Sequence, residues 1–271
     1  MARFLPLALV FLIACTACES TKGTDLAALQ ATSRLDREHS AWTALLDRHV
    51  VGDGFDYAAL AAQPEPLYAY LATLQAVTPG ELAGWSREER YAFWINAYNA
   101  YTVTRVVENY PLESIRDLDG LFGAMPVFGQ SFIPLGALHG RDGELLSLND
   151  LEHGILREEF QDARVHAAIN CASKSCPPLR NEAFVASRLD EQLDDQMRAF
   201  IADRERNRFN VPELRAELSK IFDWFKGDFQ RDATSIRGYL MRYAHESDKM
   251  FISNAKIAFT KYDWALNEAS R

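Results

Sequence analysis

The segment between Ser86 and Pro111 constrains the fold more than any other part of the chain. Ser86-Arg87-Glu88-Glu89 matches a capping box, in which the serine hydroxyl and the glutamate carboxyl each accept a hydrogen bond from the other residue's backbone. Pro111 lacks the N–H that a continuing helix needs. One stripe of the predicted helix contains Tyr91, Trp94, Ile95, Tyr98, Thr102 and Val106, and an adjoining stripe contains Phe93, Ala97, Ala100 and Val103. A helix that is apolar nearly all round is expected at the centre of the protein.

The remaining pattern predicts helices interleaved with a few short strands. Helices are expected from Ser33 to before Gly52, over 57–76 with a break near Pro64 and Pro66, from a second capping box at 149–152, over 187–203, around Trp224 and over 235–243. Strands are expected in a hairpin over 132–148 with its turn at 140–143, over 164–170, near 214–218 and from Ile257. Without a regular βαβ rhythm, this order predicts an α+β fold: a helix-rich single globular domain over residues 33–271 with a small, mainly antiparallel sheet.

The charge balance excludes one class of partner. The chain has 38 acidic and 29 basic residues and a formal net charge of −9. Nucleic-acid binding needs clustered basic residues, and no dense Lys/Arg block occurs in the sequence. We therefore expect no nucleic-acid partner.

The N-terminus has the pattern of a bacterial lipoprotein signal peptide over residues 1–14. Arg3 precedes an apolar run from Phe4 to Ala14, which is shorter than the roughly 20 residues of a membrane-spanning helix. Leu12-Ile13-Ala14-Cys15 resembles a lipobox, so Cys15 is expected to be lipidated, with residues 15–32 as a tether to the membrane. Cys18 is the alternative site of lipidation. Alternatively, the segment is an ordinary secretory signal peptide that is cleaved off, and the cysteines carry no lipid. Thr16 is not the aspartate of lipoproteins kept at the inner membrane, so we expect the outer membrane, facing the periplasm.

Four stretches resemble the signature blocks of the domain of unknown function 547 family. They are residues 93–99 (FWINAYN), 152–157 (EHGILR), 164–166 continuing into 171–179 (RVH and CASKSCPPL) and 224–229 (WFKGDF), within a family-like core of about 85–240. The resemblance implies a shared fold and a shared cluster of polar residues, but no reaction. Ala163 and Ala172 stand where the family has Pro and Gly, which puts local turn geometry in question.

The polar residues of these blocks are the candidate site residues. Asn96 and Asn99 share one face of the apolar helix, so both amides need partners if they are buried. They either bind backbone groups of an adjacent loop, or one of them orients a catalytic histidine or stabilises an oxyanion. Asn99, Arg157 and Cys176 are candidate ligand-binding residues, and Asn96, His153, His166 and Cys171 are candidate catalytic residues.

Cys171 and Cys176 have three possible roles. A disulfide suits an oxidising compartment and would close a short loop. A cysteine nucleophile would take its base from His153 or His166. A zinc site would add two of His139, His153 and His166, although the C-x4-C spacing is wider than usual.

Two hypotheses about function follow. The first, which we adopt, is an envelope lipoprotein that binds an unknown ligand or protein without catalysis, with a structural disulfide and no metal or cofactor. The second is a cysteine-histidine hydrolase or acyl-transferase, distantly like papain or transglutaminase. The redox state of Cys171 separates them, because a nucleophile must be a free thiol.

Overall fold

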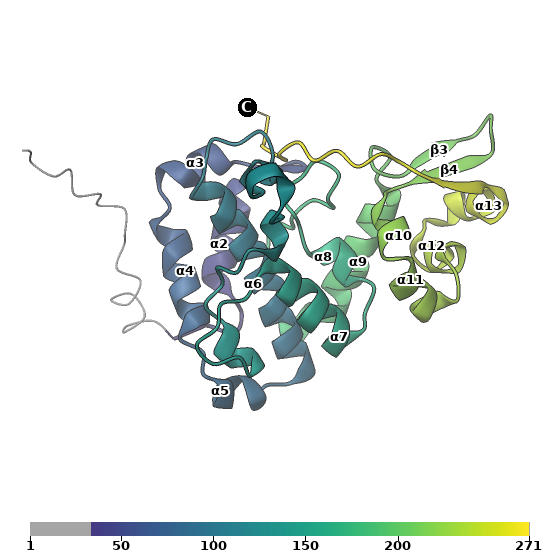
Figure 1. Ribbon diagram of the computed structural model, residues 1–271. Coiled ribbons are helices and arrows are strands. Elements are labelled where there is room, and N and C mark those ends of the chain that lie inside the picture. Colours follow the sequence, from purple (N-terminus) through teal and green to yellow (C-terminus); the bar gives the residue numbers. More distant parts are fainter. Residues whose placement is uncertain (1–33, 271) are drawn as a thin grey trace, which may run out of the picture.

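Helix α6 (Arg87–Val107) runs through the middle of the structure, a computed structural model that describes residues 34–270 (Figure 1). Its capping box is formed: Ser86 Oγ accepts from the Glu89 backbone at 3.1 Å, and the Glu89 carboxylate accepts from the Ser86 backbone at 2.8 Å. Every residue from Tyr91 to Thr104 is buried. The prediction of a central apolar helix is therefore confirmed.

The N-terminal helices pack around α6. They are α2 (Ser40–His49), α3 (Tyr57–Ala62), α4 (Glu65–Gln75) and α5 (Pro79–Ala83), with the short hairpin β1 (Val50–Val51) and β2 (Gly54–Phe55) between α2 and α3. After α6 the chain makes 3-10 turns at Ile115–Leu118, Leu121–Gly123, Val127–Gly129 and Gly136–His139. A π-helix, η5 (Asp150–Leu156), then leads directly into α7 (Arg157–Phe160). The break between α3 and α4 falls at Pro64, as predicted.

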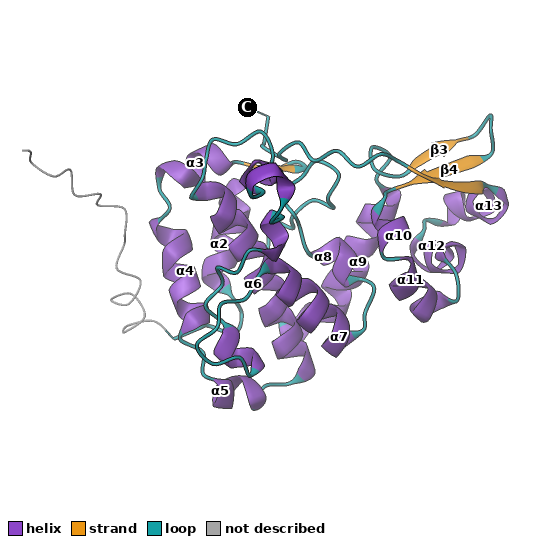
Figure 2. Ribbon diagram, in the orientation of Figure 1, coloured by secondary structure: helices purple, strands orange, loops and turns teal. Residues whose placement is uncertain are grey.

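The C-terminal part has its own helices and the larger sheet, drawn in orange in Figure 2. Its helices are α8 (Val165–Ala168), α9 (Leu189–Ala202), α10 (Ile221–Trp224), α11 (Lys226–Ala233), α12 (Ile236–Tyr243) and α13 (Glu246–Asn254). The strands are β3 (Arg208–Asn210), β4 (Arg215–Leu218) and β5 (Lys256–Phe259). Strand β4 pairs antiparallel with β3 and parallel with β5. With the antiparallel β1–β2 hairpin, the strands are mainly antiparallel, so the α+β prediction is confirmed.

Two hydrophobic clusters make up the core, and helix α9 and the C-terminal segment join them. The first cluster surrounds α6, and the second lies between α9, the larger sheet and α10 to α13. Helix α9 adds Leu189 and Leu193 to the first cluster and Met197 and Phe200 to the second. The chain after β5 then crosses back to the first half (Figure 1), where the Ala269 backbone donates to Phe55 at 3.0 Å. These links hold both halves together as one domain.

The structure corrects the predicted strand at 164–170 and the predicted hairpin at 132–148. Residues 165–168 form the single-turn helix α8, whose start is held by Asp162, since its carboxylate accepts from the Arg164 backbone at 3.0 Å. Alternating apolar residues fit a strand only where a partner strand is present, and alanine favours a helix. Over 132–148 the pairing is one bridge, Ile133 to Leu146, because Pro134 has no N–H and the chain turns into 3-10 helix at Gly136.

The second capping box also differs from the prediction. Ser147 and Asp150 form it instead of Asn149 and Glu152: Ser147 Oγ accepts from the Asp150 backbone at 3.1 Å, and the Asp150 carboxylate accepts from the Ser147 backbone at 2.8 Å. The Glu152 side chain therefore does not cap the helix and is available for other contacts. No helix within residues 34–270 is long and apolar enough to cross a membrane. The predicted signal peptide, tether and lipidated Cys15 lie outside the described residues.

Candidate functional site

A cavity of about 160 Å³ lies where the two halves of the protein meet. Its walls come from α6, the π-helix η5, α8, the loop after α8, α10 and the C-terminal segment. The lining residues are Tyr98, Phe128, Asn149, Glu152, His166, Ile169, Cys171, Cys176, Ile221, Trp224, Phe225, Tyr262 and Trp264. Aromatic rings therefore dominate a pocket that also contains a carboxyl group, an imidazole and two sulfur atoms.

Glu152 is the acidic residue of this lining. It lies on the π-helix, a form of helix that occurs frequently at functional sites. Burial raises the pKa of Glu152 to about 7, although the charge of Arg157 and a hydrogen bond with Tyr98 oppose the shift. Near neutral pH this carboxyl group is therefore able to take up or release a proton.

His166 is oriented by Asp228 at the edge of the cavity. His166 Nε2 lies 2.8 Å from Asp228 Oδ2, and the same carboxylate accepts from Arg157 Nε at 2.7 Å and from Arg231 Nη1 at 3.1 Å. Burial disfavours the Asp228 carboxylate, but the hydrogen bonds from His166 and Arg157 hold its pKa well below the ordinary 3.8.

The histidine itself is neutral near pH 7. Burial lowers the pKa of His166 against the opposing effect of Asp228, and its ring stacks on Phe225 at 3.9 Å between centroids. Since the ionised Asp228 can only accept, Nε2 carries the ring proton and Nδ1 is the unprotonated nitrogen.

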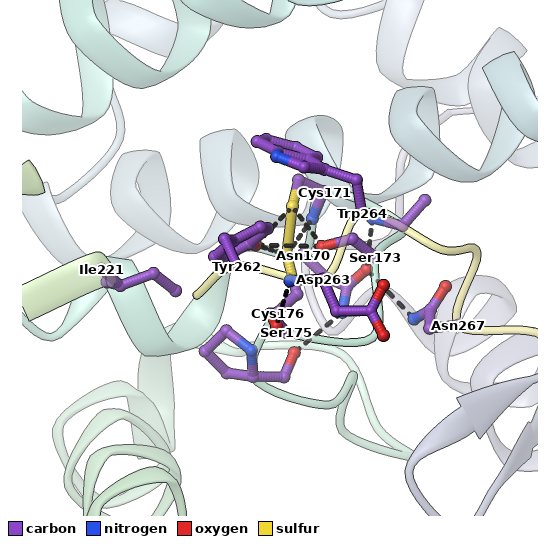
Figure 3. Close-up of a disulfide and its surroundings, with 12 residues drawn as sticks. Asn170, Cys171, Ser173, Ser175, Cys176, Ile221, Tyr262, Asp263, Trp264 and Asn267 are labelled. Carbon is purple, nitrogen blue, oxygen red and sulfur yellow. Dashed lines mark hydrogen bonds between the residues drawn. A yellow bond between two sulfur atoms is a disulfide. The ribbon is translucent and has the colours of Figure 1, made fainter. Parts of the chain in front are cut away.

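Cys171 and Cys176 form a disulfide in the cavity wall. Figure 3 shows Tyr262 beside this disulfide, and the tyrosine Oη lies 3.1 Å from each sulfur and 3.0 Å from Ser173 Oγ. Ala172, where the family pattern has Gly, has a φ of 59° in the left-handed region that glycine adopts more easily. Its backbone is held there by Asn170 Oδ1, which accepts from the Ala172 N–H at 2.7 Å.

The two asparagines of α6 bind backbone groups. Asn96 donates to the Phe184 carbonyl at 2.7 Å and accepts from the Phe184 N–H at 3.0 Å. Asn99 donates to the Ala168 carbonyl at 2.9 Å and accepts from the Asn170 N–H at 2.9 Å. Both amides thus hold loops against α6 through hydrogen bonds to the loop backbone. Neither residue is among those that line the cavity.

The structure brings some of the predicted site residues together and separates others. His166, Cys171 and Cys176 line the cavity, whereas His153, Asn96, Asn99 and Arg157 do not. The exposed His153 lies beside Arg157, with 2.9 Å between its Nδ1 and the guanidinium Nη1. His139, the third histidine considered as a zinc ligand, lies beside Glu159, with 3.3 Å between His139 Nδ1 and Glu159 Oε1. No group of three or more His, Cys, Asp or Glu side chains suited to a metal ion occurs within residues 34–270.

Most residues of the site were not among the sequence candidates, and four of these carry most of its chemistry: Glu152, Asp228, Tyr262 and Trp264. Glu152 and Asp228 stand inside two of the family-like stretches and could have been found there, although Glu152 was assigned to a capping box. Tyr262 and Trp264 lie in the C-terminal segment, where nothing in the sequence marks them. They reach the cavity because that segment crosses back between the two halves.

The comparisons with known proteins agree with the family resemblance and add no activity. Neither a curated protein nor a solved structure matches the chain. The match to a family covers α6, the π-helix, the disulfide loop and most of α9, but stops before the stretch at 224–229. Residues 82–201 match the family described as a protein of unknown function, DUF547.

Proposed function

We propose that the folded domain binds a small ligand in the aromatic cavity and that a lipid on Cys15 holds it at the bacterial cell envelope. The observation that carries the binding role is the cavity lining. Trp224, Tyr262 and Trp264 supply apolar rings, and Glu152 and Tyr98 supply a few polar groups among them. Ligand sites are typically concave and apolar with a small number of placed polar groups. The disulfide supports an oxidising compartment such as the envelope.

Binding is tested with compounds of about the size of benzene, screened by ligand-detected NMR against the full chain. An apolar cavity of about 150 Å³ can hold benzene, so ligands of this size are expected to bind. Trp224→Ala should weaken their binding, while Met250→Ala, at an exposed residue of α13 outside the cavity lining, should not. Hits that bind both variants equally well would place the ligand site elsewhere.

The anchor is tested separately by fatty-acid labelling and membrane fractionation. Cys15→Ser should abolish both the label and the membrane association, because acyl chains are what hold a lipoprotein at the membrane. Cys18→Ser serves as the matched control and should keep both. The opposite pattern would assign the lipid to Cys18.

A second candidate function, a cysteine-histidine hydrolase, is favoured by one observation. His166 is oriented by Asp228 and lines the same cavity as Cys171, so an oriented base and a potential nucleophile share one pocket. The disulfide form has no thiolate, so this function requires reduced Cys171. Iodoacetamide labelling near neutral pH without reductant decides between the two functions. Rapid labelling of Cys171 that slows in His166→Ala supports the hydrolase, and no labelling supports the binding domain.

A further inference from the structure

The charge of the cavity lining restricts the ligands that suit it. Glu152 contributes a carboxyl group to the lining, and within residues 34–270 neither a lysine nor an arginine is among the lining residues. Arg157, the cation that acts on Glu152, is engaged with Asp228 through two hydrogen bonds at 2.7 and 3.2 Å. Arg116, which lies over the Trp264 ring at 5.4 Å from its centroid, is paired with Asp119 at 3.2 Å. Among the described residues, an anionic ligand would therefore meet a carboxyl group beside cations that are already paired. A cationic ligand would meet a complementary charge.

The aromatic residues form a continuous row in the wall of the cavity that Glu152 also lines. Ring centroids are 4.7 Å apart between Trp224 and Tyr262, 4.6 Å between Tyr262 and Trp264, and 5.9 Å between Trp264 and Phe128. Aromatic faces attract cations held within about 6 Å, and this is how proteins recognise quaternary ammonium groups.

The cavity volume limits the part of the ligand that enters. At about 160 Å³ the cavity is smaller than the roughly 300–1,000 Å³ of pockets for drug-sized ligands. It is close to the roughly 150 Å³ that accommodates benzene. A trimethylammonium group is of comparable size, so a head group of this kind would fill the space.

We infer that the cavity takes the small ammonium end of a ligand, with the Glu152 carboxylate as its counter-charge and the rings of Trp224 and Tyr262 as its aromatic contact surface. This inference rests on the proposed ligand-binding function and names the chemical class of the ligand. It also makes binding depend on pH. Because burial raises the pKa of Glu152 to about 7, its carboxyl group is mostly protonated and neutral at pH 6 and mostly ionised at pH 8.

The other titratable groups around Glu152 keep the same charge near pH 7, so Glu152 is the main source of the pH dependence of binding. Tyr98 from α6 and Tyr262 from the C-terminal segment have raised pKa values and stay neutral below pH 8. Arg157 from α7 stays charged, and Asp228 from α11 stays ionised. His166 from α8 and His153 from η5 are neutral near pH 7, because burial lowers the pKa of both histidines. Of the titratable groups packed against Glu152, the carboxyl group itself is therefore the one that changes charge around pH 7.

The inference is tested by calorimetric titration of the full chain with choline and with its neutral isostere 3,3-dimethyl-1-butanol. At pH 8 choline should bind at least about tenfold more tightly than the isostere, in keeping with a desolvated cation against aromatic faces. Its affinity should fall about fivefold to tenfold at pH 6, since the binding-competent fraction falls with the carboxylate. The isostere should bind equally at both pH values.

Two variants test whether Glu152 causes the preference for choline and its pH dependence. Glu152→Gln, which keeps the shape of the side chain, should remove both the preference for choline and the pH dependence. Glu158→Gln, at an exposed residue of α7, is the matched control and should behave as the wild type.

The outcomes separate the ammonium inference from the proposed function. Equal binding of both probes at pH 8 would overturn the ammonium inference and leave small-ligand binding in place. Choline binding that persists unchanged in Glu152→Gln would overturn the role of the carboxylate. If neither probe binds at millimolar concentration, the ammonium inference fails, and the NMR screen decides the proposed function independently.

Discussion

Two buried polar clusters of this protein differ in what they bind. In the amide cluster, Asn96 and Asn99 of α6 are almost fully buried, and their side chains make two hydrogen bonds each to backbone groups. In the pocket cluster, Glu152, His166 and Asp228 bind ionisable or hydroxyl side chains and lie in or beside a cavity.

The difference shows how position in the fold determines the use of a polar side chain. An amide whose oxygen and nitrogen are both hydrogen-bonded to the backbone of one loop is fixed in place, and neither Asn96 nor Asn99 faces the cavity. A carboxyl group with a raised pKa beside an empty space still has binding capacity, and such groups concentrate at functional sites. The amide cluster should therefore control stability, and the pocket cluster should also control ligand binding and pH dependence.

The largest expected effect comes from Asp228→Ala, which tests whether the pocket cluster also stabilises the fold. Removing this carboxylate leaves Arg157 and His166 without their shared partner. Breaking a buried pair costs about 3–5 kcal/mol, and the part-exposed Arg157 places the expected loss at the lower end, about 3 kcal/mol. Urea unfolding at pH 7 measures the loss. Asp223→Ala, which breaks a half-exposed pair with Lys220, should cost less than about 1 kcal/mol.

The same substitution has a predicted pH dependence. Because the pKa of Asp228 is lowered from 3.8 in the folded protein, its contribution to stability is present above that value and is lost as the pH falls below it. The difference between the wild type and Asp228→Ala should therefore be constant at neutral pH and should shrink below about pH 4. A difference that stays constant under acid would show that the carboxylate charge is not what stabilises the fold.

Asn99→Ala tests the amide cluster and should cost about 2–3 kcal/mol. The Ala168 carbonyl and the Asn170 N–H both lose their partner in a buried place, where each unsatisfied group costs about 1–3 kcal/mol. Asn109→Ala, at an exposed residue just beyond α6, should change stability by less than about 0.5 kcal/mol. If Asn99→Ala lowered ligand affinity while stability stayed unchanged, the distinction between the clusters would be wrong.

Loss of the disulfide should have a smaller effect on stability and an additional one on binding. The closed loop is short, with a sequence separation of 5, so the loop-entropy model gives about 2 kcal/mol for a Cys171→Ser/Cys176→Ser double variant. Ligand affinity should also fall, because both residues line the cavity. The mass of the unreduced peptide over residues 170–180 provides the check: it should be lighter by two hydrogens than the reduced peptide.

Glu152→Gln should have the smallest effect, and it should be stabilising. Because the folded pKa is raised from 4.5 to about 7, the protonated form stabilises the fold below 4.5, and this contribution is lost as the pH rises through 7. The variant should match the wild type near pH 4 and exceed it by about 1–2 kcal/mol at pH 8, after a discount for partial exposure. Thermal melts over this pH range measure it, with Glu158→Gln as control. A variant less stable than the wild type at pH 8 would contradict a raised pKa.

The sequence by itself determined the centre of the fold. The Ser86 and Glu89 capping box and the continuous apolar residues after it predict α6 because helix signals act over a few neighbouring residues. The α+β class follows for the same reason. The prolines between α3 and α4 and the closing strand were also visible locally. The family-like stretches identified His166, Cys171 and Cys176, which the structure places around one cavity.

The tertiary structure alone decided which polar groups face that cavity. Residues 165–168 alternate like a strand but lie beside no partner strand, so they form a helix and turn His166 toward Asp228. The box formed by Ser147 and Asp150 frees Glu152 for the cavity. Tyr262 reaches the disulfide from a segment more than 80 residues away, at sequence separations of 91 and 86 from its two cysteines. Contacts over such separations depend on how whole elements pack, and no local pattern in the sequence records them.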